Sequence, residues 1–282
     1  MNVRIIDNWT GGVGQVLSSA VARAYDVRIA VAFVSKEGLD FLWNALRSAA
    51  ERGATIEFIV GLDGRATEPQ AVSALFDLAN HHETVSLWCW DALEAQQTFH
   101  PKLYFVRRKT QATCLIGSSN LTRGGLKGNI EVNVLCQGSD DDELVSQAYN
   151  SYLRIKQQGK ARQPDAELLC HYEELWRRAE HARKHQRAWR LYAAAEEQFR
   201  GAIQRRPRIR VQPQDLHGWL DLVYDVLPDG EFTNQQVYQY EESFRRRFPH
   251  NQNIQAKIRQ KLQELRDLGF IEHLGPGRWR KL

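Results

Sequence analysis

The feature that most constrains the fold is an alternation of short apolar runs with amphipathic stretches in the first half of the 282-residue chain. Val27–Val34 (VRIAVAFV) is rich in β-branched residues, and Lys36–Arg52 follows with the periodicity of a helix. We expect further strands at Thr55–Leu62, Val85–Trp90, Lys102–Arg107, Ala112–Gly117 and Ile130–Cys136, and helices at Pro69–His81 and about Asp141–Gln157. Strands separated by helices predict an α/β sandwich with a largely buried mixed sheet.

The second half has a different organisation. Residues 159–164 (GKARQP) are typical of a short linker, and Asp165–Gln204 has the composition of one long helical segment. From Pro213 onward the sequence predicts three helices, at Leu216–Leu227, at Thr233 to about Phe248 and at Asn253–Leu268. Two short strands around a Gly-Pro-Gly turn follow, and three helices with a terminal hairpin form a winged helix-turn-helix.

The modest net charge of +4 is distributed unevenly along the chain. Residues 1–149 carry 13 basic and 17 acidic side chains, residues 150–206 carry 13 and seven, and residues 207–282 carry 12 and ten. A basic middle suggests contact with a polyanion such as nucleic acid, and we expect phosphate contacts within 165–206. We therefore divide the chain into a catalytic domain (1–158), a basic helical connector (159–212) and a winged-helix segment (213–282).

Composition also excludes several classes of protein. No apolar run reaches the ~18 residues of a membrane span, and charged residues within the first 30 positions exclude a signal peptide. The four cysteines form no CxxC pair and no zinc-site spacing. We expect reduced thiols in a cytoplasmic protein without membrane contact.

The chemistry is concentrated in Thr98–Val134, which contains His100-x-Lys102, then Gly117-Ser118-x-Asn120, then Glu131. Alternate residues of a strand share a face, so the His100 and Lys102 side chains project together. An imidazole, an ammonium, a hydroxyl and an amide that converge on one point suit a phosphate oxyanion. A carboxylate such as Glu131 suits orientation of the imidazole.

These motifs resemble the phospholipase D superfamily, over about residues 1–155, and most of all its nuclease branch, in which a glutamate follows the asparagine by eleven residues. The resemblance implies that His100 is a nucleophile that forms a phosphohistidine and that a partner histidine protonates the leaving oxygen. It implies that Lys102, Ser118 and Asn120 hold the phosphate and that Glu131 supports the histidine. Arg107 stands where many members of the larger family have an acid.

The chain has one His-x-Lys motif, whereas this chemistry needs two histidines. We expect a homodimer in which two motifs share one catalytic centre. No metal or other cofactor is expected, because Lys102, Asn120 and their symmetry mates neutralise the charge that a metal ion would otherwise carry.

The third helix of a winged helix-turn-helix enters the major groove of double-stranded DNA, and the wing contacts the backbone or the minor groove. The candidate DNA-binding residues are Asn251, Asn253, Gln255, Lys257, Arg259, Arg278, Trp279 and Arg280. The segment resembles the C-terminal winged helix of adenine-methylation-dependent restriction endonucleases. That resemblance suggests that the segment recognises a methylated adenine. Trp279 or Tyr240 would then form the aromatic wall of the pocket that holds the methyl group.

The sequence thus predicts a metal-independent restriction-type DNA endonuclease. Two alternatives remain: a DNA-binding regulator that uses an inactive phospholipase D-like domain for dimerisation, and a phosphodiesterase that acts on phospholipid or RNA.

Overall fold

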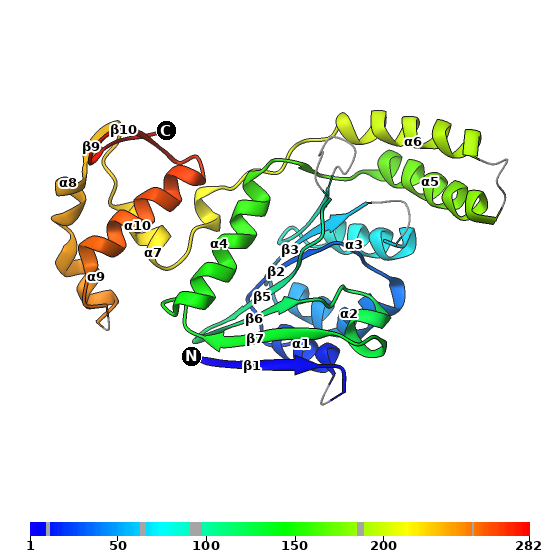
Figure 1. The fold of residues 1–282 in the computed structure, drawn as a ribbon, viewed down its shortest axis with the longest axis horizontal. Helices are drawn as coiled ribbons and strands as arrows, with labels where there is room; N and C mark the ends of the chain where they lie inside the picture. The colour runs from blue at the N-terminus through cyan, green and yellow to red at the C-terminus, as the bar shows by residue number, and fades with distance from the viewer. Residues whose placement is uncertain (10–11, 63–65, 91–97, 185–188, 250) are drawn as a thin grey trace.

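An eight-stranded mixed sheet forms the main body of the protein, with strand order β1-β7-β6-β5-β2-β3-β4-β8 (Figure 1). This computed structural model describes residues 1–9, 12–62, 66–90, 98–184, 189–249 and 251–282. The strands are β1 (Asn2–Asp7), β2 (Asp26–Val31), β3 (Thr55–Gly61), β4 (Val85–Trp90), β5 (Lys102–Arg108), β6 (Gln111–Gly117), β7 (Val132–Gly138) and β8 (Ala161–Arg162). The pairs β2–β3 and β3–β4 are parallel and the other pairs are antiparallel, which confirms the α/β class and the mixed sheet.

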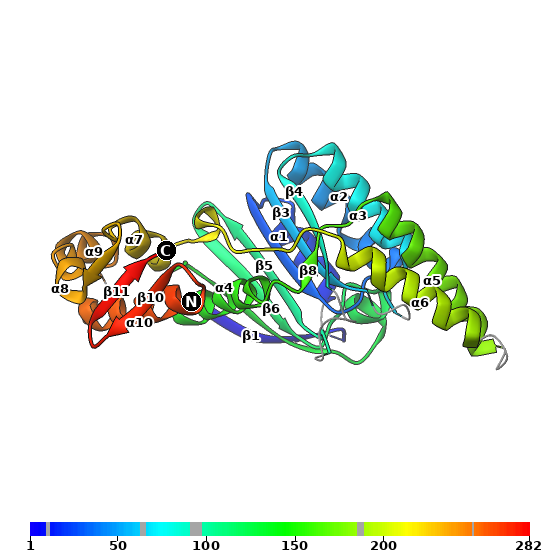
Figure 2. The same cartoon turned by 90° about the horizontal axis from the view of Figure 1, so that it is seen from above.

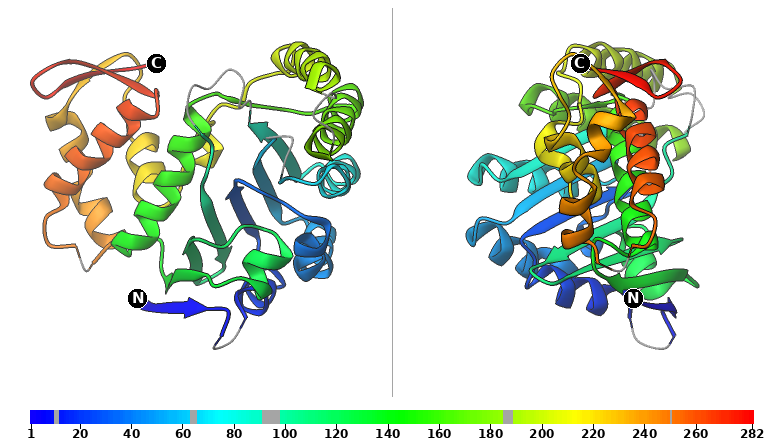
Figure 3. Two further views of the ribbon diagram at one scale, coloured as in Figure 1. Left: turned by 45° about the vertical axis from the view of Figure 1, so that its right-hand side comes forward. Right: turned by 90° about the vertical axis from the view of Figure 1, so that its left-hand side faces the viewer.

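Helices cover both faces of this sheet (Figure 3). One face packs against α1 (Val13–Val21), α2 (Lys36–Glu51) and α3 (Pro69–His81), and the other against α4 (Glu143–Gln157). All six residues of β2 are buried, including the charged Asp26 and Arg28, as expected for a strand that is covered on both sides. The predicted helices at Lys36–Arg52, Pro69–His81 and Asp141–Gln157 are confirmed to within two residues at each end.

The helical segment predicted over Asp165–Gln204 is a pair of antiparallel helices, α5 (Ala166–Lys184) and α6 (Trp189–Gln204), and residues 185–188 lie outside the described part. The pair extends past the edge of the sheet (Figure 2), and the Tyr172 hydroxyl donates to the Thr67 carbonyl at 2.7 Å. The basic surplus of this connector is partly neutralised within the chain. Arg177 and Arg178 pair with Glu174, and Arg206 pairs with Glu167.

The C-terminal helices and hairpin form the predicted winged helix. It contains α7 (Trp219–Asp225), α8 (Asn234–Tyr238), α9 (Glu241–Arg247), α10 (Ile254–Asp267) and a three-stranded sheet of β9 (Glu231–Thr233), β10 (Ile271–Gly275) and β11 (Arg278–Lys281). Thr233 caps α8, because its hydroxyl accepts a hydrogen bond from the Gln236 amide. The second predicted helix is two short helices, α8 and α9.

Across the described ranges, no helix is both long and apolar enough to cross a membrane.

Candidate active site

The predicted catalytic residues come together at one end of the sheet, where β5 begins, β6 ends and β7 begins. Because β6 runs antiparallel to both neighbours, its last residue lies beside the first residues of β5 and β7. Lys102 is the first residue of β5 and His100 lies two residues before it, Ser118 and Asn120 follow β6, and Glu131 directly precedes β7. Sequence motifs that are about 30 residues apart therefore share one location.

His100 and Lys102 form a close pair. The Lys102 Nζ lies 2.6 Å from Nδ1 and 2.9 Å from Nε2 of His100, and it donates to the His100 carbonyl at 3.0 Å. The imidazole is exposed, whereas Lys102 is buried. Partial burial and the Lys102 charge lower the pKa of His100, which favours the neutral ring that a nucleophile requires.

Glu131 is buried, and its Oε1 accepts a hydrogen bond from the Asn129 side-chain amide at 3.2 Å. Burial lowers the pKa of Lys102, and the Glu131 charge opposes that shift. The expectation that Glu131 orients the imidazole is not met within one chain, since among the described residues it makes no hydrogen bond with His100. In this chain the carboxylate balances the charge of Lys102.

Ser118 is fixed against β7 by a hydrogen bond that its hydroxyl oxygen accepts from the Val132 amide at 3.0 Å. The residue before Ser118 must be a glycine for a steric reason. A Cβ on Gly117 would lie 2.4 Å from the Val132 carbonyl oxygen, so only glycine permits this approach of β6 to β7.

The Asn120 amide has a defined orientation. Its Oδ1 accepts a hydrogen bond from the Phe33 amide at 3.2 Å, which leaves Nδ2 to donate to a ligand. The Phe33 ring packs edge-on against His100 with centroids 5.6 Å apart. A Cβ on Gly125 would lie 2.3 Å from the Asn120 carbonyl, so the glycine-rich turn after the motif packs directly under it.

The arrangement therefore offers an imidazole, a cation and an amide donor around one exposed point. Such donors stabilise the charge that develops on a phosphoryl group under attack. Within the described residues, no group of three histidine, cysteine or acidic side chains is placed to hold a metal ion.

The end of β5 that lies away from this site has a different role, which sequence reasoning missed. Arg107 is buried and pairs with Asp26 at 2.6 Å and with Asp140 at 2.9 Å. Next to it, Arg28 pairs with Asp26 and Glu57, and Lys156 pairs with Glu57 and Asp215. The sequence gives no signal of this cluster, because its members come from six separate segments of the chain.

The candidate DNA-binding residues divide into those with exposed side chains and those that pack within the protein. Asn253, Gln255, Arg259, Arg278 and Arg280 are exposed. Gln255 donates to Glu241, Arg259 donates to the Tyr238 hydroxyl at 3.0 Å, and Arg278 and Arg280 pair with Glu231. Asn253 caps α10, and Asn251 accepts a hydrogen bond from the Asn253 amide.

Two members of that prediction are corrected. Lys257 is largely buried and pairs with Glu143 at 3.0 Å, so its side chain faces α4. Trp279 is 5% exposed, and its Nε1 donates to Asn234 within the winged-helix segment. The alternation of basic and aromatic residues in β11 places Arg278 and Arg280 outside and Trp279 in the core.

Comparison with known proteins matches two parts of the chain. Residues 15–155 match the family model described as cardiolipin synthase, PLD-like domain, and residues 215–281 match the model described as Dam-replacing HTH domain.

Solved structures with a similar fold include a phospholipase D family member, Nuc from Salmonella typhimurium (18% identity, TM-score 0.45), and NucT from Helicobacter pylori (17%, 0.45). Each match covers 58% of this chain and 99% of the other. Phosphatidylserine synthase from Haemophilus influenzae matches with 14% identity and a TM-score of 0.48, over 67% of this chain and 47% of the other.

Proposed function

We propose, since this chain belongs to the phospholipase D-like (PLD-like) family and carries a Dam-replacing helix-turn-helix domain, that it is a restriction-type DNA endonuclease of the cytoplasm. The observation that carries the proposal is the convergence of His100, Lys102 and Asn120 at one sheet end in a chain that also carries a DNA-binding module. A phospholipid or RNA substrate would give the winged-helix segment no evident role.

The reaction has two steps. A ring nitrogen of His100 attacks the phosphorus, so that an N–P bond forms while the P–O bond to the leaving oxygen breaks, and a second histidine donates a proton to that oxygen. Water then attacks the phosphohistidine, the N–P bond breaks, and the second histidine takes the proton from water. Lys102 Nζ and Asn120 Nδ2 hold the non-bridging oxygens in both steps, without a metal ion.

The second histidine comes from a second copy of the chain. Apolar side chains on β1, β6 and β7 lie exposed on the sheet face that α4 covers elsewhere, and we call them the apolar patch: Val3, Ile5, Ile116, Val132 and Val134. Each is between 37% and 62% exposed, and Ile116, Val134 and Ile5 form one cross-strand row. Ser118 contacts the Val132 backbone, so the patch adjoins the catalytic motif.

Recognition of a methylated adenine remains part of the proposal. Of the two aromatic residues considered for the wall of a methyl pocket, Tyr240 is 43% exposed and Trp279 is buried. Tyr240 is therefore the candidate.

The test is incubation of the purified protein with adenine-methylated and unmethylated plasmid in EDTA, beside a His100→Ala variant. We expect discrete fragments from the wild-type protein alone, because the variant lacks the nucleophile. Cleavage that stops in EDTA would contradict the metal-free mechanism, and binding without cleavage would favour the regulator. Equal cleavage of both plasmids would remove the methyl-sensing part only.

A further inference from the structure

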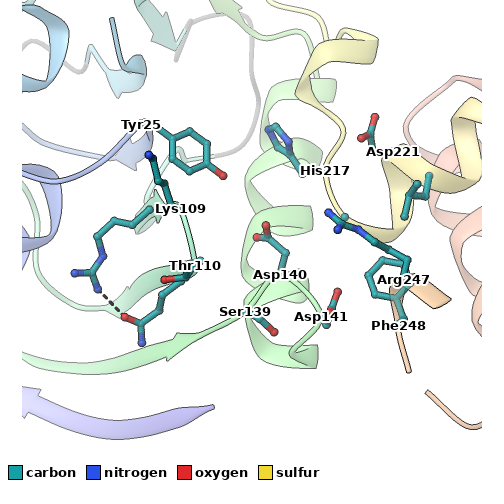
Figure 4. Close-up of a pocket in the computed structure, with 15 residues that line it drawn as sticks. Tyr25, Lys109, Thr110, Ser139, Asp140, Asp141, His217, Asp221, Arg247 and Phe248 are labelled. Carbon is teal, nitrogen blue, oxygen red and sulfur yellow. Dashed lines mark hydrogen bonds between the residues drawn. The ribbon is translucent and has the colours of Figure 1, made fainter. Parts of the chain in front are cut away.

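The winged-helix segment lies at the end of the sheet opposite to the catalytic residues (Figure 1). A cavity of about 430 Å³ marks this junction (Figure 4). Lys109 and Thr110 of the β5–β6 turn line one side of it, and Asp221 and Arg247 of the winged-helix segment line the other. β5 runs from Lys102 at the site to Arg108 at the junction, which is about 20 Å at ~3.3 Å per residue.

The recognition helix α10 is docked along α4 at this end. Lys257 pairs with Glu143, Lys261 donates to Ser146 at 3.3 Å, and Asn150 donates to Glu264 at 2.8 Å. The paired positions increase together along both helices, so α4 and α10 run parallel and in register. Lys261 is 1% exposed, which makes this a packed interface and not a loose contact.

A buried ionic cluster anchors the chain just before α7. Asp215 is buried and accepts from Lys156 at 2.8 Å and from the Gln212 amide at 2.8 Å. Its carbonyl accepts from the Tyr149 hydroxyl at 2.7 Å, and Arg28 lies 3.5 Å away. Loss of this carboxylate would leave buried cations short of a partner, so the anchor resists opening.

We propose that the enzyme cuts DNA outside the sequence that its winged-helix segment binds, at an offset that the Asp215 anchor keeps constant. The inference rests on the proposed endonuclease function. B-DNA rises ~3.4 Å per base pair, so the 20 Å along β5 correspond to an offset of at least about six base pairs. In a homodimer with one shared centre, each winged-helix segment is separated from the cut by the sheet of its own protomer.

The first measurement compares two maps on the same DNA. Base-methylation interference with the His100→Ala variant locates the base pairs that the winged-helix segment reads, and the ends produced by wild-type protein locate the cut. We expect one constant separation of about six base pairs or more. Cuts between or directly beside the base pairs that are read would overturn the offset, whereas absence of any cut by the wild-type protein would overturn the proposed function and the offset with it.

The second measurement tests the anchor. In Asp215→Asn we expect cut positions to spread over several base pairs, while hydrolysis of the small diester bis(p-nitrophenyl) phosphate stays within about twofold of wild type. Asp225→Asn, an exposed aspartate of α7, is the matched control and should keep one offset. If Asp215→Asn fails to fold, Glu143→Lys sets a like charge opposite Lys257 and should spread the cuts too. A sharp offset in the folded variants would overturn the anchor.

Discussion

At the scale of single residues, the chemistry depends on two positions: Lys102, the first residue of β5, and His100, two residues before it. The spacing places both side chains on one face, which the sequence alone predicts, and the structure adds that Lys102 is buried while His100 is exposed. The hydrogen-bond partner of Glu131 was not predictable from the sequence. Asn129 donates to Glu131 from the end of a glycine-rich turn, and the shape of that turn depends on the close approach of Gly125 to the Asn120 backbone. Residue types and spacing therefore identify the candidate site, and tertiary contacts decide which groups touch.

The pKa of His100 provides the test at this scale. Partial burial and the Lys102 charge lower this pKa, so the ring should titrate below its ordinary value of 6.5. In Lys102→Gln the repelling charge is gone, and the midpoint should rise. NMR titration of the His100 ring measures both, with Lys109→Gln at the other end of the sheet as control. An unchanged midpoint in Lys102→Gln would contradict the electrostatic role of the lysine.

At the scale of elements, the sequence predicts the buried strands and misses the exposed one. β2 and β3 are rich in apolar and β-branched residues and are almost wholly buried, whereas β1 has the sequence NVRIID and is largely exposed, so it gives a weak signal. The bounds of α5 and α6 within Asp165–Gln204 are also not predictable, because the composition is helical throughout. Side-chain direction on α10 depends on α4, which is about 100 residues away in sequence.

Two basic residues of α10 allow a matched test of which of its side chains face DNA and which face α4. Arg259 is exposed, whereas Lys257 is turned to Glu143 of α4. In a His100→Ala background, Arg259→Ala should weaken binding to the recognised DNA by about 1–3 kcal/mol, as expected for the loss of a base or phosphate contact. Lys257→Ala should change it by less than about twofold. Gel-shift or fluorescence titration compares the two, and equal losses would show that both residues contact DNA.

At the scale of the whole molecule, one exposed face and one incomplete site point to the same partner. The apolar patch lies beside a motif that supplies one of the two histidines. Val134→Arg should place a charge in the interface, give a monomer in sedimentation and abolish DNA cleavage, since the second histidine is lost. Leu191→Arg on α6, at a position that is 50% exposed, should change neither. A monomeric Val134→Arg protein that still cuts DNA would contradict the shared centre.

The parallel register of α4 and α10 also limits how a protein of this kind can acquire a new specificity by recombination. A foreign winged helix joined within the connector would pack against Glu143, Ser146 and Asn150 of α4. It would lack the side chains that pair with them here, which are Lys257, Lys261 and Glu264 of α10. A crossover between β7 and α4 would instead transfer both helices as one unit. Functional chimeras should therefore carry their own α4, and the heritable unit of specificity begins near residue 139, well before the winged helix itself.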